Sequence, residues 1–346
     1  MKILISSDGT HAHLYQRQAW AEAFNACGIQ AALWDCKNVN AFDAFDSFEP
    51  DIFLGQSYNL QPDLLKCIYE RPHLKVGLRS GDWGTHKVDN EKYNVLHCSQ
   101  QEMDTLGKLK EQTGQPNFVH IHYSPEGVAQ THNNFESIGI KPISLMMCAN
   151  ISAYGQASFD PELECDIGFV GGYWPYKAQV IDPYLFPLLH PVGKHKAKIF
   201  GNQPWIGVNQ YCGLIPDERV KDLFVSAKIC PNLSEPHAKA YGFDVNERIF
   251  KILYAGGFCI SDNVKGYEMF GDGIVIAKSP EDFYEKVNHY LENESERRSI
   301  AKKGKDVVLN NHTNVHRIAQ ILKELDYEDL SKELISQYKE LMNNAV

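Results

Sequence analysis

The sequence predicts an α/β protein with two Rossmann-like domains that face each other across a cleft. At 346 residues, the chain is longer than one hydrophobic core usually supports. Short apolar runs alternate with amphipathic stretches in both halves, as expected for βα units on a parallel sheet. Between the halves, residues 139–161 are less periodic and rich in Gly, Pro, Ser and Asn. We therefore expect the chain to cross between domains there.

The composition limits the kinds of partner that the protein is expected to bind and the compartment in which it is expected to lie. The net charge of −10 argues against a long nucleic-acid footprint, although a local basic cleft can still bind a phosphate. We find no apolar run long enough for a membrane span, and the opening residues 1–8 are typical of a buried strand rather than a signal peptide. The nine cysteines are scattered singly, which suits free thiols in a reducing compartment. We therefore expect a cytoplasmic protein without a membrane span.

The N-terminal domain, expected over residues 1–150, shows the βα alternation from its first residues. A loop at 7–10 separates the first strand from the first helix, and Gly28 ends that helix. Helices are predicted over 13–27 and 42–48. Strands are predicted over 2–6, 29–34, 51–55, 75–79, 93–98 and 118–122.

The C-terminal domain, expected over residues 163–320, repeats the pattern. Its first strand runs into the pair Gly171-Gly172. Strands are predicted over 165–170, 197–201, 227–231, 257–262 and 273–276, and helices over 246–255, 280–292 and 295–310. Residues 321–346 form a helical tail rich in Lys and Glu. This tail either crosses back onto the first domain or stands as a free amphipathic helix.

The stretch 246–262 has the most informative pattern for chemistry. Asn246 can cap a helix whose free N–H groups offer a seat for phosphate, and Arg248 lies in the first turn. A guanidinium there can hold a diphosphate through two hydrogen bonds. Gly256 ends the helix, and Asp262 stands at the carboxyl end of the following strand. On spacing alone, a capped helix with a solvated arginine explains the same pattern.

The order of motifs in the second half adds a family resemblance. Residues 166–322 resemble the C-terminal domain of the CgeB-like (spore-maturation protein) glycosyltransferases, which are relatives of the group 1 GT-B enzymes. The matching segments are Asp166–Gly172, Ala227–Leu233, Asn246–Asp262, Val264–Gly271, Ser295–Arg298, Ala301–Gly304 and His312–Arg317. The first 150 residues match only in general architecture.

This resemblance implies a GT-B fold and the transfer of a sugar from a nucleotide diphosphate donor to an acceptor. It implies that Gly171 and Gly172 form a glycine-rich turn at the diphosphate. Lys177 would be the cation beside that turn, and Arg248 the second clamp. A tight turn and a solvated helix lysine are the alternative interpretations. The acceptor stays open among a glycan, lipid head group, protein, small metabolite and nucleic-acid base.

One departure from the group 1 pattern concerns the ribose contact. Many retaining members place two glutamates eight positions apart, and this chain has Phe243 and Lys251 at those places. The ribose contact and the stereochemical outcome are therefore open, with Asp262 and Glu268 as substitute candidates. His237, just before the donor helix, is a candidate for facing the transferred sugar, with a solvated loop histidine as the alternative.

We expect no metal and no cofactor beyond the donor. The chain contains no Asp-x-Asp pair, through which GT-A enzymes hold a divalent cation at the diphosphate. The pairs His11-x-His13 and His120-x-His122 lack a neighbouring Cys or Glu at familiar zinc spacing. A helix terminus and cationic side chains would replace the metal.

An inverting transferase also needs a general base near the acceptor hydroxyl. Asp82 is the preferred candidate because Gly81 and Gly84 leave backbone space beside it, and an Asx-turn is its alternative role. Further candidates at strand ends are Asp8, His11, His97 and His122. Two rival functions stay open: a nucleotide-sugar epimerase on the same fold, and a non-catalytic sugar- or nucleotide-binding protein.

Overall fold

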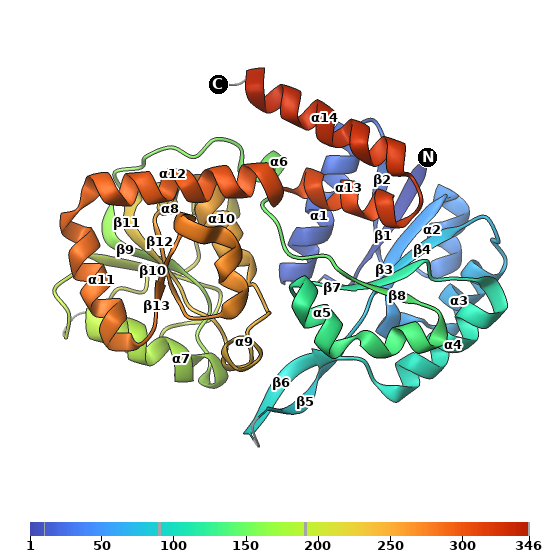
Figure 1. Ribbon diagram of the computed structural model, residues 1–346, viewed down its shortest axis with the longest axis horizontal. Coiled ribbons are helices and arrows are strands. Elements are labelled where there is room, and N and C mark those ends of the chain that lie inside the picture. Colours follow the sequence, from blue (N-terminus) through green and yellow to red (C-terminus); the bar gives the residue numbers. More distant parts are fainter. Residues whose placement is uncertain (10, 89–90, 190–191, 345–346) are drawn as a thin grey trace. The chain divides into compact units, whose positions relative to one another are not determined.

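The computed structural model describes residues 1–9, 11–88, 91–189 and 192–344. The chain forms two compact units, the first made of Met1–Met146 with Asn314–Val346 and the second of Met147–Thr313. Each unit is built around its own parallel sheet, and helices cover both faces of each sheet (Figure 1). The predicted α/β class is therefore confirmed.

The first unit contains a six-stranded sheet in the order β2-β1-β3-β4-β7-β8, and all its neighbouring strands are parallel. Its strands are β1 (Lys2–Ser7), β2 (Gln30–Asp35), β3 (Ile52–Gln56), β4 (Lys75–Arg79), β7 (Phe118–Ile121) and β8 (Lys141–Ser144). The apolar runs predicted these strands well, except for β8, which lies inside the expected domain crossing. β8 is short, occupies the sheet edge and contains Pro142, which only an edge strand tolerates easily.

Alternating side chains of this sheet bury two separate cores. Leu4 and Phe53 face one side, with α2 (Ala41–Phe48), α3 (Pro62–Tyr69) and α4 (Gln100–Thr113). Ile3 and Ile5 face the other side, with α1 (His11–Ala26) and α13 (Asn314–Glu324). The remaining helical elements of this unit are η1 (Ser57–Asn59), α5 (Pro125–Thr131), η2 (Asn133–Ile138) and α14 (Glu328–Asn344).

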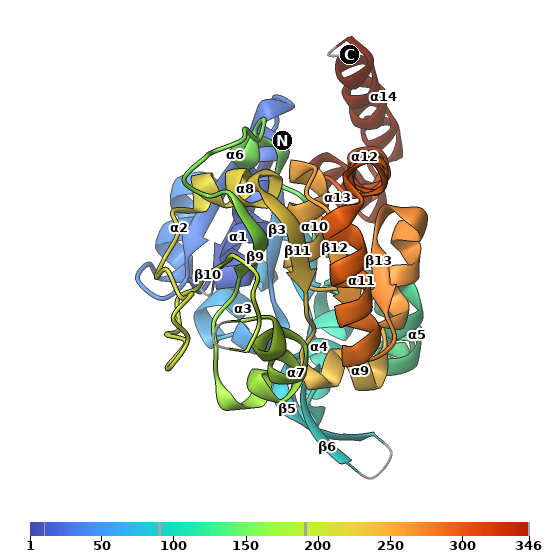
Figure 2. The same cartoon turned by 90° about the vertical axis from the view of Figure 1, so that its left-hand side faces the viewer.

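A β-hairpin leaves the first unit between β4 and α4. Its strands β5 (Asp82–Val88) and β6 (Glu91–His97) pair antiparallel with each other and protrude beyond the sheet (Figure 2). The strand expected at 93–98 therefore forms, but it does not join the parallel sheet. Parallel neighbours need a long crossover, whereas only two residues separate β5 from β6. Asp82, expected in a loop, begins β5 opposite His97.

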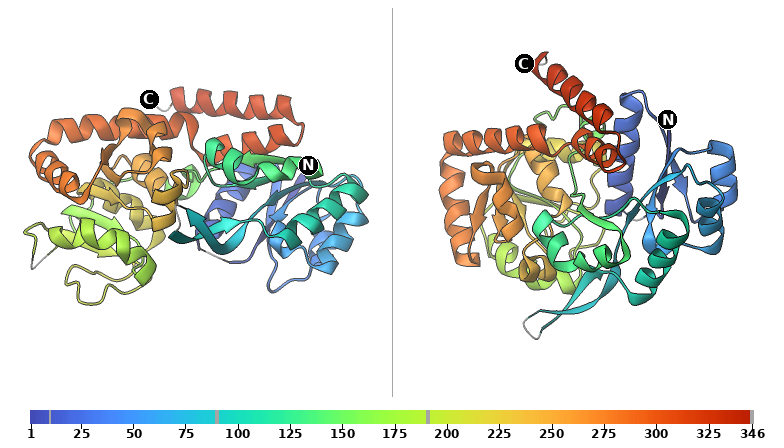
Figure 3. Two further views of the ribbon diagram at one scale, coloured as in Figure 1. Left: turned by 60° about the horizontal axis from the view of Figure 1, so that its bottom comes forward. Right: turned by 45° about the vertical axis from the view of Figure 1, so that its right-hand side comes forward.

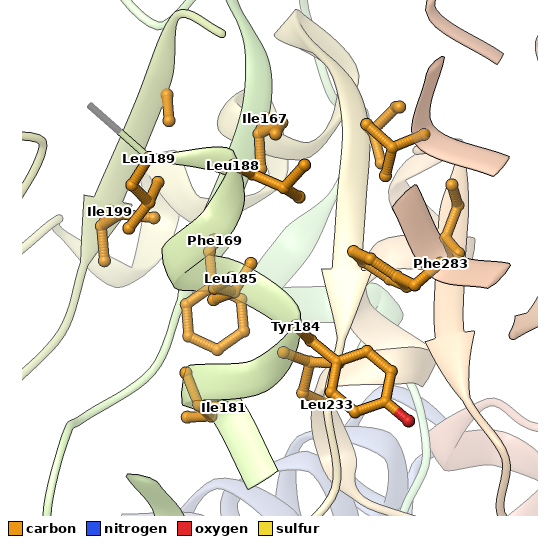
Figure 4. Packing of buried hydrophobic residues seen from close by; sticks show 14 of the residues in the cluster. Ile167, Phe169, Ile181, Tyr184, Leu185, Leu188, Leu189, Ile199, Leu233 and Phe283 are labelled. Atoms are coloured by element: carbon orange, nitrogen blue, oxygen red, sulfur yellow. The ribbon is translucent and has the colours of Figure 1, made fainter. Parts of the chain in front are cut away.

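The second unit contains a five-stranded parallel sheet in the order β10-β9-β11-β12-β13. Phe169 on β9 and Ile199 on β10 pack against Ile181 and Leu185 of α7 on one face (Figure 4). The strands are β9 (Cys165–Val170), β10 (Ala197–Phe200), β11 (Ala227–Asn232), β12 (Cys259–Asp262) and β13 (Val275–Ala277). The helical elements are α6 (Ile151–Tyr154), α7 (Pro175–Leu185), η3 (Phe186–Leu188), α8 (Asp217–Ser226), α9 (Pro236–Tyr241), α10 (Glu247–Ala255), η4 (Lys265–Gly273), α11 (Pro280–Glu292) and α12 (Glu294–Asn311).

The C-terminal helices α13 and α14 belong to the first unit (Figure 3). Ile318, Ile321 and Leu322 are fully buried in the core that holds Ile3 and Trp20. Residues 314–320, expected with the C-terminal domain, therefore lie with the first unit, because their apolar stripe fits the face covered by α1. None of the described helices has the length and apolar character to cross a bilayer, and all nine cysteines are free thiols.

The burial of Ile318 predicts that the C-terminal segment stabilises the first unit. Ile318→Ala should lower its free energy of unfolding by about 2–5 kcal/mol, because a buried Ile→Ala change removes apolar contacts and leaves a cavity. Urea unfolding followed by circular dichroism measures this loss. Lys323→Ala, on the exposed side of α13, is the matched control. Equal unfolding curves for the two variants would show that α13 does not hold this core.

Candidate functional site

The sheet of the second unit changes direction of winding at β9. The chain passes from β9 to β10 on one side and then returns to β11 on the other side. At such a switch point the connections after the two central strands diverge, and open α/β sheets bind ligands there. The residues at this point are Val170, which ends β9, the following Gly171 and Gly172, and Leu233 and Ser234 after β11.

Arg248 ties the two strand ends together. Its Nε donates to the Val170 carbonyl at 2.7 Å and its Nη1 donates to the Leu233 carbonyl at 3.2 Å. The guanidinium also lies over the Phe169 ring, 4.7 Å from the ring centre. The remaining nitrogen, Nη2, has no hydrogen-bond partner among the described residues. Arg248 therefore holds the frame of the site and keeps one donor for a ligand.

Lys177 lies in the first turn of α7 and is only 6% exposed. Burial, with a smaller contribution from the charge of Arg248, lowers the pKa of Lys177 to about 7, and Glu235 has a smaller opposite effect. Its Nζ lies over the Trp174 ring at 4.7 Å and forms no ion pair with any residue in the described part of the chain. A buried ammonium that forms no ion pair favours an anionic ligand, because an anion would stabilise its charged form.

Gly171 and Gly172 allow a close approach around these cations. A Cβ on Gly171 would lie 2.9 Å from the Phe169 ring and 3.0 Å from Arg248 Nη2. A Cβ on Gly172 would lie 2.8 Å from Asn202 Oδ1. The turn leads into α7, whose N-cap residue Trp174 supplies no side-chain hydrogen bond to the first turn. The first N–H groups of α7 are therefore uncapped beside Lys177.

His237 is fixed rather than solvated. It is 3% exposed, its Nε2 lies 2.8 Å from Asp244 Oδ2, and its ring is stacked on Tyr176. Nδ1 lies 3.4 Å from the Tyr176 hydroxyl and 3.8 Å from Glu235 Oε2. The solvated-loop alternative is therefore wrong, because Asp244 holds the imidazole in one orientation next to the helix that carries Lys177.

Asp262 supports the loop after β11. The side chain is completely buried, and it accepts hydrogen bonds from the Ser234 amide at 3.1 Å and the Ser234 hydroxyl at 2.8 Å. Burial raises the pKa of this carboxyl. Ser234 and Asn246 both reach the buried Tyr267 hydroxyl at 2.8 Å. Asp262 thus orders the strand ends from beneath instead of presenting a free carboxylate.

Comparison with known proteins yields one family match and many similar folds. Residues 187–323 match the glycosyl transferase-like family. No protein of curated function matches the sequence. Sucrose-phosphate synthase from Thermosynechococcus elongatus has a TM-score of 0.60 and 10% identity, covering 99% of this chain and 100% of its own. T4 phage β-glucosyltransferase with UDP and Mn²⁺ has a TM-score of 0.56 and 14% identity, covering 97% and 99%.

The fold is GT-B. The same T4 phage enzyme has also been solved with UDP-glucose, with a TM-score of 0.54 and 13% identity, covering 97% of this chain and 99% of that one. The expected GT-B fold is thereby confirmed over nearly the whole chain, while identities this low show the fold alone.

Of the expected donor-site residues, Gly256 and Glu268 lie away from this cluster, and Asn246 lies near it but is already hydrogen-bonded. Gly256 ends α10 at the opposite edge of the sheet, next to Phe224 and Lys228. Glu268 is exposed on η4, and no contact joins it to Lys177 or Arg248. Asn246 is at the right edge, but its Oδ1 caps α10 and its Nδ2 binds Tyr267, so α10 already has its own cap.

Lys251, which stands where a glutamate was expected, has a structural role. Its Nζ forms ion pairs with Glu247, one turn earlier on α10, and with Asp217 on α8. The acidic Glu247 in the first turn and this pairing make the start of α10 a poor seat for phosphate. The uncapped first turn of α7 is the better one.

The candidate bases of the first unit are only partly described. The backbones of His11 and Asp82 begin α1 and β5, but their side chains lie outside the described residues, as does that of His97. His122 follows β7, is 9% exposed and lies beside His13, with ring centres 6.2 Å apart. Asp8 follows β1, and its Oδ1 is 3.8 Å from Arg17 Nη1.

Sequence analysis missed several residues around both groups of cations. In the second unit these are Glu235 and Asp244, which flank His237. In the first unit they are Arg17 and Arg79, both 4% exposed. The sequence does contain a pattern that indicates Arg79, because this basic residue stands at the carboxyl end of a strand whose central residues are uncharged.

The lowered pKa of Lys177 predicts a specific pH dependence of stability. Below about pH 7 the lysine is charged in both states. From there up to the ordinary pKa of 10.5, only the unfolded chain keeps the proton, so wild-type stability rises relative to Lys177→Met by about 1 kcal/mol per pH unit. Urea unfolding between pH 6.5 and 9.5 measures the difference. Lys302→Met, an exposed change on α12, should follow the wild type; parallel wild-type and Lys177→Met curves would disprove the burial of charge.

Proposed function

We propose that this chain is a glycosyltransferase that binds a nucleotide diphosphate sugar between Lys177 and Arg248 and transfers its sugar to an acceptor. The observation that carries this proposal is the buried Lys177 ammonium, which forms no ion pair within the described residues. It lies beside a second cation and the uncapped start of a helix. The GT-B fold and the glycosyl transferase-like match over residues 187–323 support a donor site in this unit. The CgeB-like subtype is the more specific part of the proposal.

The chemistry follows from where negative charge develops. The acceptor oxygen forms a bond to the anomeric carbon, the bond from that carbon to the diphosphate oxygen breaks, and the acceptor proton passes to a base. Lys177 and Arg248 Nη2 stabilise the leaving diphosphate, because cations in a buried site act more strongly than in water. The first N–H groups of α7 add further donors.

His237 acts as a positioning residue in this proposal. Asp244 fixes its tautomer and Tyr176 stacks on its ring, so it orders the start of α7 where Lys177 lies. Its burial to 3% leaves little surface for direct contact with a sugar. The choice of hexose or pentose therefore rests with other groups.

We further propose that donor binding needs no metal. Among the described residues, no group of three or more His, Cys, Asp or Glu is placed to hold an ion, and two cations already stand at the site. One similar structure, of T4 phage β-glucosyltransferase, contains UDP and Mn²⁺. Nucleotide binding should be equally tight in EDTA and in Mn²⁺. A tenfold loss of affinity in EDTA would contradict this part of the proposal.

Nucleotide binding tests the donor site directly. UDP, GDP and ADP should be screened by thermal shift, and we expect one of them to stabilise the protein. Lys177→Met should weaken that binding at least tenfold, because it removes the cation without removing a structural hydrogen bond. Arg248→Ala is a poorer test, since it also unties Val170 from Leu233.

Lys302→Met makes the same change of charge on an exposed face and should bind nucleotide as the wild type does. A lack of response to every nucleotide, or equal binding by both lysine variants, would overturn the donor site. Slow donor hydrolysis without an acceptor is expected of a transferase. Isomerisation of the donor sugar would point instead to an epimerase.

A further inference from the structure

A second group of buried cations lies in the first unit, where β1, β3, β4 and β7 end. Arg17 comes from α1 and Arg79 is the last residue of β4. Both are 4% exposed, and the charge of each lowers the pKa of His13 and of His120, after the larger effect of burial. The two guanidiniums therefore share one small region of the protein.

Arg79 is incompletely paired. Its Nη1 donates to the Tyr58 hydroxyl at 3.0 Å and lies 3.5 Å from the Gly81 carbonyl. Its Nη2 is buried and has no hydrogen-bond partner among the described residues. An unsatisfied charged donor in a protein interior is costly, so this atom marks a place where an acceptor is expected.

The charges around the two arginines do not balance. Asp8 lies 3.8 Å from Arg17, and Gln56, which faces the same guanidinium, is neutral. The nearby Glu102 accepts hydrogen bonds from Ser80 and Gly81, and no ion pair joins it to either arginine. His13 and His120 cannot compensate a positive charge. Among the described side chains, Asp8 is therefore the one carboxylate that lies in ion-pair range of either arginine.

We infer that this cluster binds a dianionic group on the acceptor, with the chemistry of a phosphate monoester. Two guanidiniums match the several oxygens of a phosphate, and Arg79 Nη2 is a donor already in place. His13 and Tyr58 beside the cluster are only half-buried, so the cluster reaches toward the protein surface at these two side chains. The inference rests on the proposed function: the donor diphosphate occupies the second unit, and an anion in the first unit belongs to the other substrate.

Sulfate is the first probe, because it keeps two negative charges from pH 5 to 8. The thermal midpoint should be followed against sulfate at constant ionic strength, with chloride as the reference salt. Arg79→Gln should weaken the apparent sulfate affinity at least tenfold. Arg71→Gln, a surface arginine of the same unit paired with Asp46, makes the same charge change and should keep the wild-type response. It also corrects for the general stabilising effect of sulfate.

Asp8→Asn removes a negative charge from the cluster, whereas Arg79→Gln removes a positive one. Removing the one carboxylate near Arg17 should tighten sulfate binding several-fold, which a purely structural role of the arginines does not predict. It also keeps the inference testable if Arg79→Gln fails to fold. Equal sulfate responses of Arg79→Gln and Arg71→Gln, or an Asp8→Asn response no stronger than that of the wild type, would overturn it.

Acceptor assays distinguish the sources of the anion. With the donor sugar found by the nucleotide screen, hexose phosphates, hexuronates and neutral hexoses are compared as acceptors. Phosphates should react fastest, and Arg79→Gln should raise their KM at least tenfold without changing the KM of the donor. A preference for hexuronates or neutral hexoses contradicts the phosphate assignment. Lys177→Met should keep the part of the sulfate response that Arg79→Gln removes, so failure of the donor site and failure of this anion site give different results.

Discussion

The proposed donor site depends on one interaction, the bridge that Arg248 makes between Val170 and Leu233. The connections that follow two neighbouring strands run in opposite directions at a switch point, so the backbone groups at the two strand ends no longer pair with each other. A guanidinium with fixed, planar donors can join the two carbonyls and still present a nitrogen to a ligand. The close glycine turn and the buried neighbour Lys177 both follow from this placement.

The positive charge at this switch point has to be compatible with a stable folded protein. Most of the surrounding groups are neutral or face away, as Asp262 does when it binds Ser234. The protein thus keeps a local excess of positive charge within a chain of net charge −10. The net negative charge of the chain therefore does not exclude an anionic ligand, because the positive charge that such a ligand needs is concentrated in a few residues at the sheet edge.

The sequence allowed much of the fold to be predicted, because strands buried on both faces, such as 165–170, appear as continuous apolar runs. It did not distinguish the hairpin strand at 93–98 from a sheet strand, since pairing depends on neighbours distant in sequence. Lys177 and Arg248 were predicted as site residues through the order of motifs. Arg17 and Arg79 were not, because they lie 62 positions apart in the chain and meet only once β1 and β4 share a sheet. Asn246 was predicted to contribute to ligand binding, but its side chain caps its own helix, α10.

The return of α13 to the first unit has a consequence for biosynthesis. The second unit is one uninterrupted segment, 147–313, which is inserted in the sequence between the two segments that form the first unit. During translation its whole core is available before Ile318 and Leu322, which complete the core around Ile3 and Trp20. Domains generally fold as units as they emerge. The strands of the six-stranded sheet must therefore keep the part of this face that α13 covers exposed until α13 is made, so these earlier strands complete their core after the second unit.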